Sequence, residues 1–220
     1  MHNSVLIIGV GRFGRYLALK FSELGNDVMI VDRDEDTISK LMSEVTSAKI
    51  ADCTREEALQ GIGVKNFDVC FVCTGSDFQA SLEITSRLSE MGAKKIISKA
   101  STDIHAKFLL RNGADEVVYP ERDRAVELAV KYSDTRILDF AQMDDDIGIY
   151  EVSSADSWWG KTISSLGIRT KYKLNILAVK RDHKTIALPE PSFEIQKGDA
   201  LIVMAEKTSL DKYLKSVKTR

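Results

Sequence analysis

Residues 5–14 read Val5-Leu6-Ile7-Ile8-Gly9-Val10-Gly11-Arg12-Phe13-Gly14. The four residues before the first glycine are an uninterrupted apolar run, which is typical of a strand buried on both faces. The next six fit the pattern G-x-G-x-x-G, and apolar residues then recur at helical spacing through residue 24. A second apolar run ends at Asp32. Strand, glycine loop, helix and a terminal acid form the context that a dinucleotide-binding fingerprint requires. The sequence therefore predicts a nucleotide site built from Gly9, Val10, Gly11, Arg12, Phe13, Gly14 and Asp32.

Each part of this fingerprint has a physical role. The glycines let the backbone approach phosphates closely, and the start of the helix offers unpaired N–H donors. Asp32 can accept hydrogen bonds from both ribose hydroxyls, and its charge would repel a 2′-phosphate, so NADP is disfavoured. Arg12 lies inside the loop, where it could neutralise a further phosphate and favour ATP or ADP over NAD. From the residues alone, a surface arginine explains Arg12 equally well.

The first two thirds of the chain alternate between strand and helix patterns. Apolar runs predict further strands over residues 28–31, 47–51, 69–73, 96–98 and 117–119. Helical spacing or helix-start signals predict helices over 12–24, 35–45, 55–60, 77–91 and 103–111, with another beginning at Pro120. Six strands joined by helices imply right-handed crossovers. The predicted fold is α/β, with a Rossmann-like doubly wound parallel sheet.

The pattern changes after Ser133. An acidic turn at residues 144–146 is followed by expected strands near 149–152, 176–180 and 201–204. A helix opened by residues 160–162, a hairpin turn over 181–184 and a closing helix over 210–217 complete the pattern. This mixture predicts a second, smaller α+β domain. We expect domains at residues 1–134 and 135–220.

Other strand ends should contribute to the same site, because ligands bind at the carboxyl ends of parallel strands. A polar residue at a strand end could instead belong to a turn or cap a helix. Arg33 could also cover an adenine face. The predicted nucleotide-binding set therefore adds Arg33, Asp34, Asp52, Cys53, Thr74, Gly75, Ser76, Lys99, Ala100 and Ser101.

Composition excludes some classes of protein. Lys and Arg total 31 against 33 Asp and Glu, a net charge of −2, which argues against a nucleic-acid partner because such proteins carry a basic face. The chain has three cysteines, and no export signal precedes the first apolar run, so a reduced cytoplasmic protein is expected. Cys70 and Cys73 stand three apart in a strand and should face opposite sides, which predicts core packing rather than a redox or metal pair.

Several motifs together resemble a known family. They are residues 8–14, 113–115, 119–123, 160–162, 166–169 and 197–203. In this order they are similar to the cytoplasmic gating subunits of bacterial potassium uptake systems of the Ktr and Trk type, which are built from RCK domains. The glycine-loop arginine points to the Ktr-type branch.

The resemblance implies an N-terminal RCK domain that binds ATP or ADP and carries a crossover helix, and a C-terminal RCK regulatory domain. It also implies a homo-oligomer, built from dimers into a ring that is octameric in this family. Such a ring docks under a potassium-translocating membrane subunit, which places the protein in the cytoplasm, peripheral to the inner face of the cell membrane.

The resemblance further assigns roles to individual residues. Arg12 would reach the terminal phosphate region, and His105 would lie near the phosphates. Glu121 would be linked to a divalent cation. Some members bind cyclic di-AMP in the C-terminal domain, and the matching region contains Ile168, Arg169, Ile176 and Pro191.

Two functions from different classes follow. The first is a nucleotide-sensing regulatory subunit that gates a potassium uptake protein through an ATP- or ADP-dependent conformational change. The alternative is a small NAD-dependent oxidoreductase, which needs a substrate domain and an acid or base beside the nicotinamide. The second domain offers only His183 for that role. We therefore expect a protein that is not an enzyme.

Overall fold

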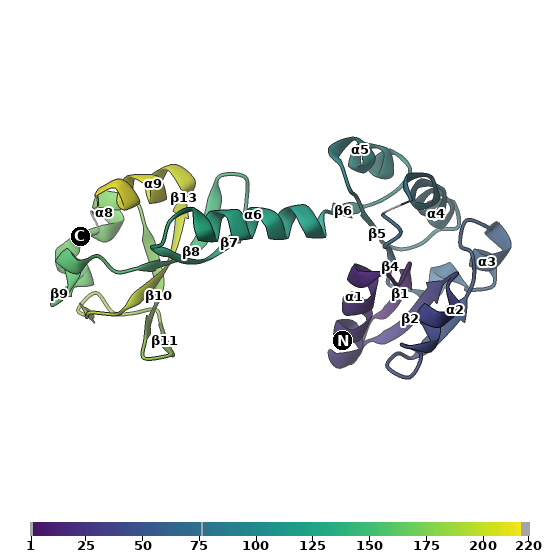
Figure 1. Cartoon of the computed structure of the whole chain (residues 1–220), viewed down its shortest axis with the longest axis horizontal. Coiled ribbons are helices and arrows are strands. Elements are labelled where there is room, and N and C mark those ends of the chain that lie inside the picture. The colour runs from purple at the N-terminus through teal and green to yellow at the C-terminus, as the bar shows by residue number, and fades with distance from the viewer. Residues whose placement is uncertain (1, 76, 217–220) are drawn as a thin grey trace. The chain divides into compact units, whose positions relative to one another are not determined.

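The computed structural model describes residues 2–75 and 77–216. The chain divides into two compact units after Pro120 (Figure 1). Helix α6, Pro120–Ser133, begins at this division. None of its residues is fully buried, but Val130 packs against the core of the second unit. The domain boundary between residues 134 and 135, which assigned α6 to the first domain, remains a prediction.

The first unit is a six-stranded parallel sheet, as the alternating sequence pattern predicts. The strand order is β3-β2-β1-β4-β5-β6, so the order reverses direction between β1 and β4, where ligands of such sheets bind. The strands are β1 (Ser4–Ile8), β2 (Asp27–Asp32), β3 (Ser47–Ile50), β4 (Val69–Val72), β5 (Ile96–Lys99) and β6 (Glu116–Val118). The helices are α1 (Arg12–Glu23), α2 (Glu35–Ser39), α3 (Glu56–Gln60), α4 (Phe78–Glu90) and α5 (Asp103–Arg111), with a 3₁₀ turn over Val64–Asn66. The Rossmann-like fold is confirmed.

Two hydrophobic cores use the alternating side chains of the strands. In β1, Leu6 belongs to one core and Ile7 to the other, and both are fully buried. The same alternation separates Cys70, in the core with Leu6, from Cys73, which packs against the core with Ile7. The two sulfurs therefore lie on opposite faces of the sheet, as the strand spacing predicts.

The predicted helix over residues 35–45 is wrong in its second half. Helix α2 ends at Ser39, and the Leu41 N–H then donates to the Ile38 carbonyl, a bond typical of a tight turn. The hydroxyl of Thr46 accepts the N–H of Val28, the second residue of β2. This contact satisfies a strand amide and directs the chain into β3.

The second unit is a smaller antiparallel domain. Its main sheet has the order β11-β10-β13-β8-β7. The strands are β7 (Ile137–Gln142), β8 (Ile147–Ser153), β10 (Asn175–Arg181), β11 (Lys184–Ala187) and β13 (Ala200–Glu206), and β9 (Lys161–Thr162) pairs with β12 (Glu194–Ile195). The helices are α7 (Ile163–Leu166), α8 (Ile168–Tyr172) and α9 (Lys207–Ser216), with a 3₁₀ turn over Asp156–Trp158. The sequence did not reveal β7, β9 or β12.

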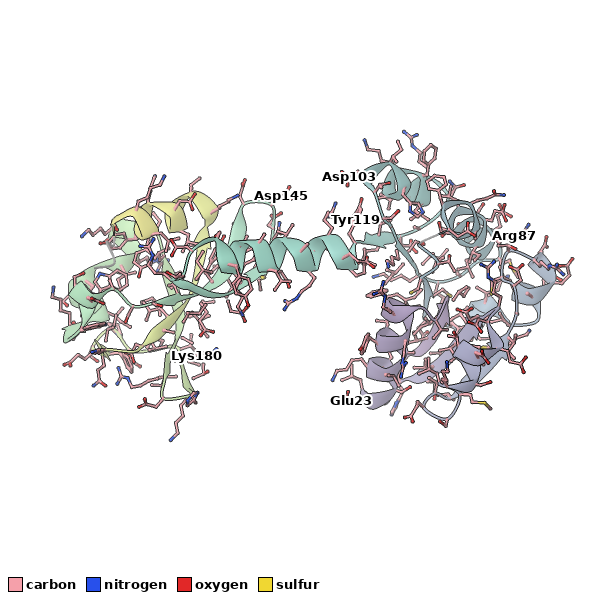
Figure 2. All side chains as sticks on the ribbon, viewed as in Figure 1. Glu23, Arg87, Asp103, Tyr119, Asp145 and Lys180 are labelled. Carbon is pink, nitrogen blue, oxygen red and sulfur yellow. The ribbon has the colours of Figure 1, made fainter. Side chains whose placement is uncertain are left out.

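The predicted hairpin turn joins β10 to β11. Asp182 and His183 have φ values of 48° and 64°, the pair of positive angles that a two-residue type I′ turn requires. Before this turn, in β10, the Nζ of Lys180, labelled in Figure 2, lies 2.5 Å from a carboxylate oxygen of Glu151 in β8.

Among the helices in the described part of the chain, none combines the length and the apolar character needed to cross a membrane.

Aromatic rings and one ion pair organise the core of the second unit. Trp158, Tyr172 and Tyr213 contact one another with centroids 5.1–5.6 Å apart, and the Tyr213 hydroxyl donates to the Ser153 carbonyl. Beside this core, Arg181 donates from Nε and Nη2 to the two oxygens of Asp199, both at 2.7 Å. The Asp199 side chain is fully buried. Burial acts to raise the pKa of Asp199, but hydrogen bonds from Arg181 and the Gln196 N–H outweigh it and lower that pKa.

Arg181→Ala is expected to lower the free energy of unfolding of the second unit by about 3–5 kcal/mol, because it leaves a buried carboxylate without its cation. Since folding lowers the pKa of Asp199, the stability that this pair adds in the wild type is present above the unfolded carboxyl value of about 3.9 and is lost in acid below it. Both tryptophans, Trp158 and Trp159, lie in this unit, so urea unfolding followed by their fluorescence measures it selectively.

Lys131→Ala is the matched control, because it removes a more exposed ion pair with Asp139 in the same unit. The control should lower the free energy of unfolding by less than about 1 kcal/mol. Equal losses for the two variants would contradict a structural role for the buried pair.

Candidate functional site

The glycine loop packs closely against neighbouring backbone. Gly9 has a φ of 88°, and a Cβ there would lie 2.8 Å from the Thr74 methyl carbon. A Cβ on Gly14 would lie 2.1 Å from the Gly9 carbonyl oxygen, so α1 begins against the end of β1. Around Gly11, by contrast, a Cβ would meet nothing within 4 Å. Gly9 and Gly14 are therefore needed for packing, whereas Gly11 leaves its backbone open to a ligand.

Asp32 connects this loop to β2. Its Oδ2 accepts the Val10 N–H at 2.7 Å, and its Oδ1 accepts the Asp34 N–H at 3.0 Å. A carboxylate oxygen can accept a second hydrogen bond, and Asp32 is only partly buried. The carboxylate can therefore hold the loop and still accept ribose hydroxyls.

A cavity of about 230 Å³ opens beside the loop. Its walls come from the ends of β1, β2, β3 and β4 and from the first turns of α4. It gathers seven residues that the sequence placed in a nucleotide site: Gly9, Gly11, Asp32, Arg33, Asp52, Cys53 and Thr74.

Asp52 stands ionised in the wall of this cavity. It accepts hydrogen bonds from the side chain and the backbone N–H of Thr54, at 2.7 and 3.0 Å. The side-chain bond is the largest of the effects that lower the pKa of Asp52. Asp32 and Asp52 together supply hydrogen-bond acceptors to this cavity, and Arg33 lines it as well.

The cysteines in the cavity are unreactive. Cys53 and Cys73 both line it, and burial raises the pKa of each thiol to about 12. Because the thiolate is the nucleophilic form, neither residue is suited to covalent chemistry at neutral pH.

The remaining predicted residues that the structure describes do not line this cavity. Arg12 is exposed on the first turn of α1, and the Lys99 ammonium lies 5.9 Å from the centre of the Phe13 ring. Gly75 packs against Lys99, since a Cβ on it would lie 3.1 Å from Lys99 Cγ. Ser76 lies outside the described residues. The others in this group are Val10, Gly14, Asp34, Ala100 and Ser101, and a direct ligand contact for any of these residues remains a prediction.

His105 is inside the fold. Its side chain lies between α4 and α5, the residue is only 1% exposed, and Nε2 is 2.7 Å from the Ser81 hydroxyl oxygen. Burial lowers its pKa. A role near the phosphates remains a prediction, which from this position would act through neighbouring residues.

The sequence reasoning missed the wall that α4 contributes. Asp77, Ala80 and Ile84 line the cavity. The Asp77 side chain caps α4 by accepting the Ala80 N–H at 3.0 Å. The predicted helix over residues 77–91 located this helix start, and the N-cap signal of its first aspartate could have added Asp77 to the site. Two helices, α1 and α4, thus begin next to the cavity, and helix N-termini favour anions.

Glu121 stands on the exposed first turn of α6. No group of three or more His, Cys, Asp or Glu side chains in the described residues could hold a metal ion. The described residues alone therefore do not fit a divalent cation, and Glu121 as a ligand remains a prediction that requires donors from elsewhere.

The four residues predicted for a second ligand all lie in the second unit. Ile168 is buried in its core and Ile176 packs against that core, whereas Arg169 and Pro191 are exposed. The Pro191 carbonyl accepts the Ser164 N–H at 2.8 Å. Contact of any of them with cyclic di-AMP remains a prediction.

A larger cavity of about 530 Å³ lies in the second unit between α6, β7, β8 and α9. Phe140, Tyr150 and Leu210 line it together with acidic and basic side chains, among them Asp144 and Lys207. The described residues around it include no glycine loop, so the smaller cavity of the first unit is better suited to phosphates.

Gly14→Ala and Gly11→Ala should separate packing from binding. Gly14→Ala places a methyl group against the Gly9 carbonyl and should lower the free energy of unfolding by about 1–3 kcal/mol. Gly11→Ala should leave thermal unfolding, followed by circular dichroism, unchanged, because its Cβ meets open space. It should nevertheless weaken nucleotide binding in titration calorimetry, since the methyl group occupies the phosphate approach. Wild-type binding by Gly11→Ala would move the phosphates away from this loop.

Comparison with known proteins agrees with this geometry. The TrkA-N domain model matches residues 5–120 and the TrkA-C domain model matches residues 147–218. The Ktr system potassium uptake protein C of Bacillus subtilis is 36% identical over 99% of this chain and 98% of its own length.

Two solved structures share the fold. The GsuK channel matches all of this chain and 40% of its own chain, with a TM-score of 0.70 at 19% identity. The Kef CTD of Shewanella denitrificans in its AMP-bound form matches 59% of this chain and 78% of its own, with a TM-score of 0.51 at 26% identity. With both domains in order over nearly the whole length, the chain belongs to the Ktr/Trk family of potassium uptake proteins, which confirms the resemblance found in its motifs.

Proposed function

We propose that this protein is a nucleotide-sensing regulatory subunit of a potassium uptake system. The observation that carries the proposal is the open backbone at Gly11 beside the Asp32 carboxylate, in a chain that aligns from end to end with a Ktr potassium uptake protein. The ligand is an adenine nucleotide, held with its ribose on Asp32 and its phosphates at the start of α1.

The cavity favours some nucleotides over others. Asp32 suits a free ribose, so ATP, ADP and NAD fit and NADP does not. The AMP-bound Kef structure is a relative in fold that holds an adenine nucleotide. Arg12, exposed on the first turn of α1, can add a charge-assisted contact to a γ-phosphate that ADP and NAD lack.

Regulation follows from this difference in contacts. A ligand shifts a conformational equilibrium only by its difference in affinity for the two states. If ATP and ADP bind the two arrangements of an oligomeric ring unequally, their exchange changes how the subunits pack. The membrane subunit that transports potassium responds to that packing, and no bond in the nucleotide needs to break.

The oxidoreductase alternative lacks an acid or base in the right place. The described wall of the cavity offers Asp32, Asp52 and Asp77 and two protonated thiols. His105 already has hydrogen-bond partners inside the protein, and His183 is exposed on a hairpin of the second unit. Binding without catalysis is the function that these residues support.

The proposed setting is the inner face of the cell membrane, where the ring docks on its potassium-translocating partner. A divalent cation near Glu121 and cyclic di-AMP at the second unit belong to the same proposal as further ligands. Nothing in the net charge of −2 favours a nucleic-acid partner.

Titration calorimetry with ATP, ADP, NAD and NADP tests the ligand class. NADP should bind at least about tenfold more weakly than NAD, because an unfavourable charge contact above about 1.4 kcal/mol corresponds to that factor. Equal affinities for NAD and NADP would remove Asp32 from ribose recognition.

Arg12→Ala should weaken ATP binding more than ADP binding, by on the order of 1–3 kcal/mol, because the lost bond is to a charged group. Arg15→Ala is the matched control. It removes an equally exposed arginine from the same helix turn but outside the glycine loop. Parallel losses for ATP and ADP in Arg12→Ala would leave nucleotide binding intact and remove Arg12 from the sensing mechanism.

Light scattering tests the assembly. The protein should run as a dimer or a larger ring, at a multiple of the 24.5 kDa chain mass. A monomer at every concentration, with and without nucleotide, would contradict gating by a ring.

A further inference from the structure

His105 joins three segments of the first unit. Its Nε2 lies 2.7 Å from the Ser81 hydroxyl oxygen on α4, and its Nδ1 lies 3.4 Å from the backbone nitrogen of Ser101, in the loop after β5. The ring also packs on Phe78, the first residue of α4, with centroids 4.8 Å apart. His105 itself is the third residue of α5.

The hydrogen bonds assign one neutral form of the ring. The Ser81 hydroxyl donates to the Phe78 carbonyl at 2.8 Å, so Nε2 must carry the proton that fills the contact with Ser81. The Ser101 N–H donates to Nδ1, which must therefore be bare. Both contacts require the same tautomer, with the proton on Nε2.

A second proton would break this arrangement. It would stand on Nδ1, so the bond that the Ser101 N–H donates there would be lost, and the Ser101 hydroxyl oxygen, also 3.4 Å from Nδ1, would have to accept the new proton instead. The charge would be buried and would lie in the first turn of α5, where the helix dipole is positive. Burial already lowers the pKa of His105, which agrees with a neutral ring at physiological pH.

Charged groups stand on each neighbouring element. Asp77 caps α4, Asp103 begins α5 and accepts the Tyr119 hydroxyl, and Lys99 ends β5. Two carboxylates and one ammonium therefore stand on the elements around the ring, and burial is the cause that lowers the pKa of His105. Figure 2 labels Asp103 and Tyr119 at this end of α5.

The contacts of His105 reach the wall of the nucleotide cavity. Ser81 is the neighbour in sequence of Ala80, and Phe78 is the neighbour of Asp77, both of which line that cavity. Ser101 follows Lys99 and Ala100, which were predicted to approach the ligand. His105 therefore contacts the sequence neighbours of cavity-lining residues, and it does not itself line the cavity.

We propose that His105 is an acid-sensitive latch on the nucleotide site. When neutral, it holds the first turn of α4 and the loop after β5 in the arrangement that binds nucleotide; when protonated, it releases both. This inference rests on the proposed nucleotide function and adds a response to pH.

The direction of the pH effect on stability and binding follows from the burial of the neutral ring. Since the pKa of folded His105 is lowered, the unfolded chain takes up the proton first as the pH falls below about 6.5. The stability and the binding-competent fraction are complete above that value and are lost as the pH falls toward the lowered one. Apparent affinity declines with the competent fraction.

The first test is the ratio of ADP affinities at pH 8 and pH 5 by calorimetry, for the wild type and for His105→Gln. The protonation of ADP itself changes the affinity ratio equally for both proteins, so it cancels when the two ratios are compared. The wild-type ratio should exceed that of the variant on the order of three- to tenfold. His183→Gln, which removes an exposed histidine of the second unit, should keep the wild-type ratio. Equal ratios for wild type and His105→Gln would overturn the latch.

The second test needs no nucleotide. Carbon-13 histidine NMR of the wild-type protein, with signals assigned through His2→Gln and His183→Gln, should give His105 a pKa below the usual histidine value of about 6.5. A His105 signal that titrates at or above that value overturns the proposal even if His105→Gln does not fold. Failure of ADP to bind at any pH would contradict the proposed function, and the NMR result would still decide whether His105 is held neutral.

Discussion

The hydrogen bond from the Val10 N–H to the Asp32 carboxylate is the contact on which the first unit's site depends. It joins the glycine loop after β1 to the end of β2, the neighbouring strand. Without it, a backbone donor in the loop would lose its partner, and the loop would keep the bond from the Gly9 N–H to the Val31 carbonyl and the close packing of Gly9 and Gly14. One carboxylate therefore fixes the loop that faces phosphates and offers acceptors to a ribose.

The strand order explains why other polar groups gather at the same place. Because the order reverses between β1 and β4, the helices that follow these two strands leave in different directions and open a crevice at their starts. Helix α1 brings the glycine loop, and α4 brings Asp77 and Ala80 to the opposite wall. His105 contacts Ser81 of α4 from within the fold. The two sides of the cavity therefore depend on different groups, the Asp32 carboxylate on one side and the buried His105 imidazole on the other.

Local sequence was sufficient wherever local forces decide the structure. Continuous apolar runs, glycine turns and helical spacing predicted the parallel sheet and most of the residues at its strand ends. Prediction failed where a distant partner decides. The second half of the expected 35–45 helix turns into β3 because Thr46 bonds to β2. Strand β7 has four exposed residues of six, so no alternating apolar pattern marks it, and β9 and β12 are two residues each. The burial of His105 depends on Ser81 and Phe78, which no spacing rule connects to it.

Hydrogen–deuterium exchange with and without ADP tests the central claim most directly, because it reports where the ligand binds. If the nucleotide occupies the first-unit crevice, ADP should slow exchange in residues 9–14, 32–34 and 52–54 and at the start of α4. Strands β7 to β13 of a subunit should change less. Protection confined to the second unit, with no change at the glycine loop, would contradict the account.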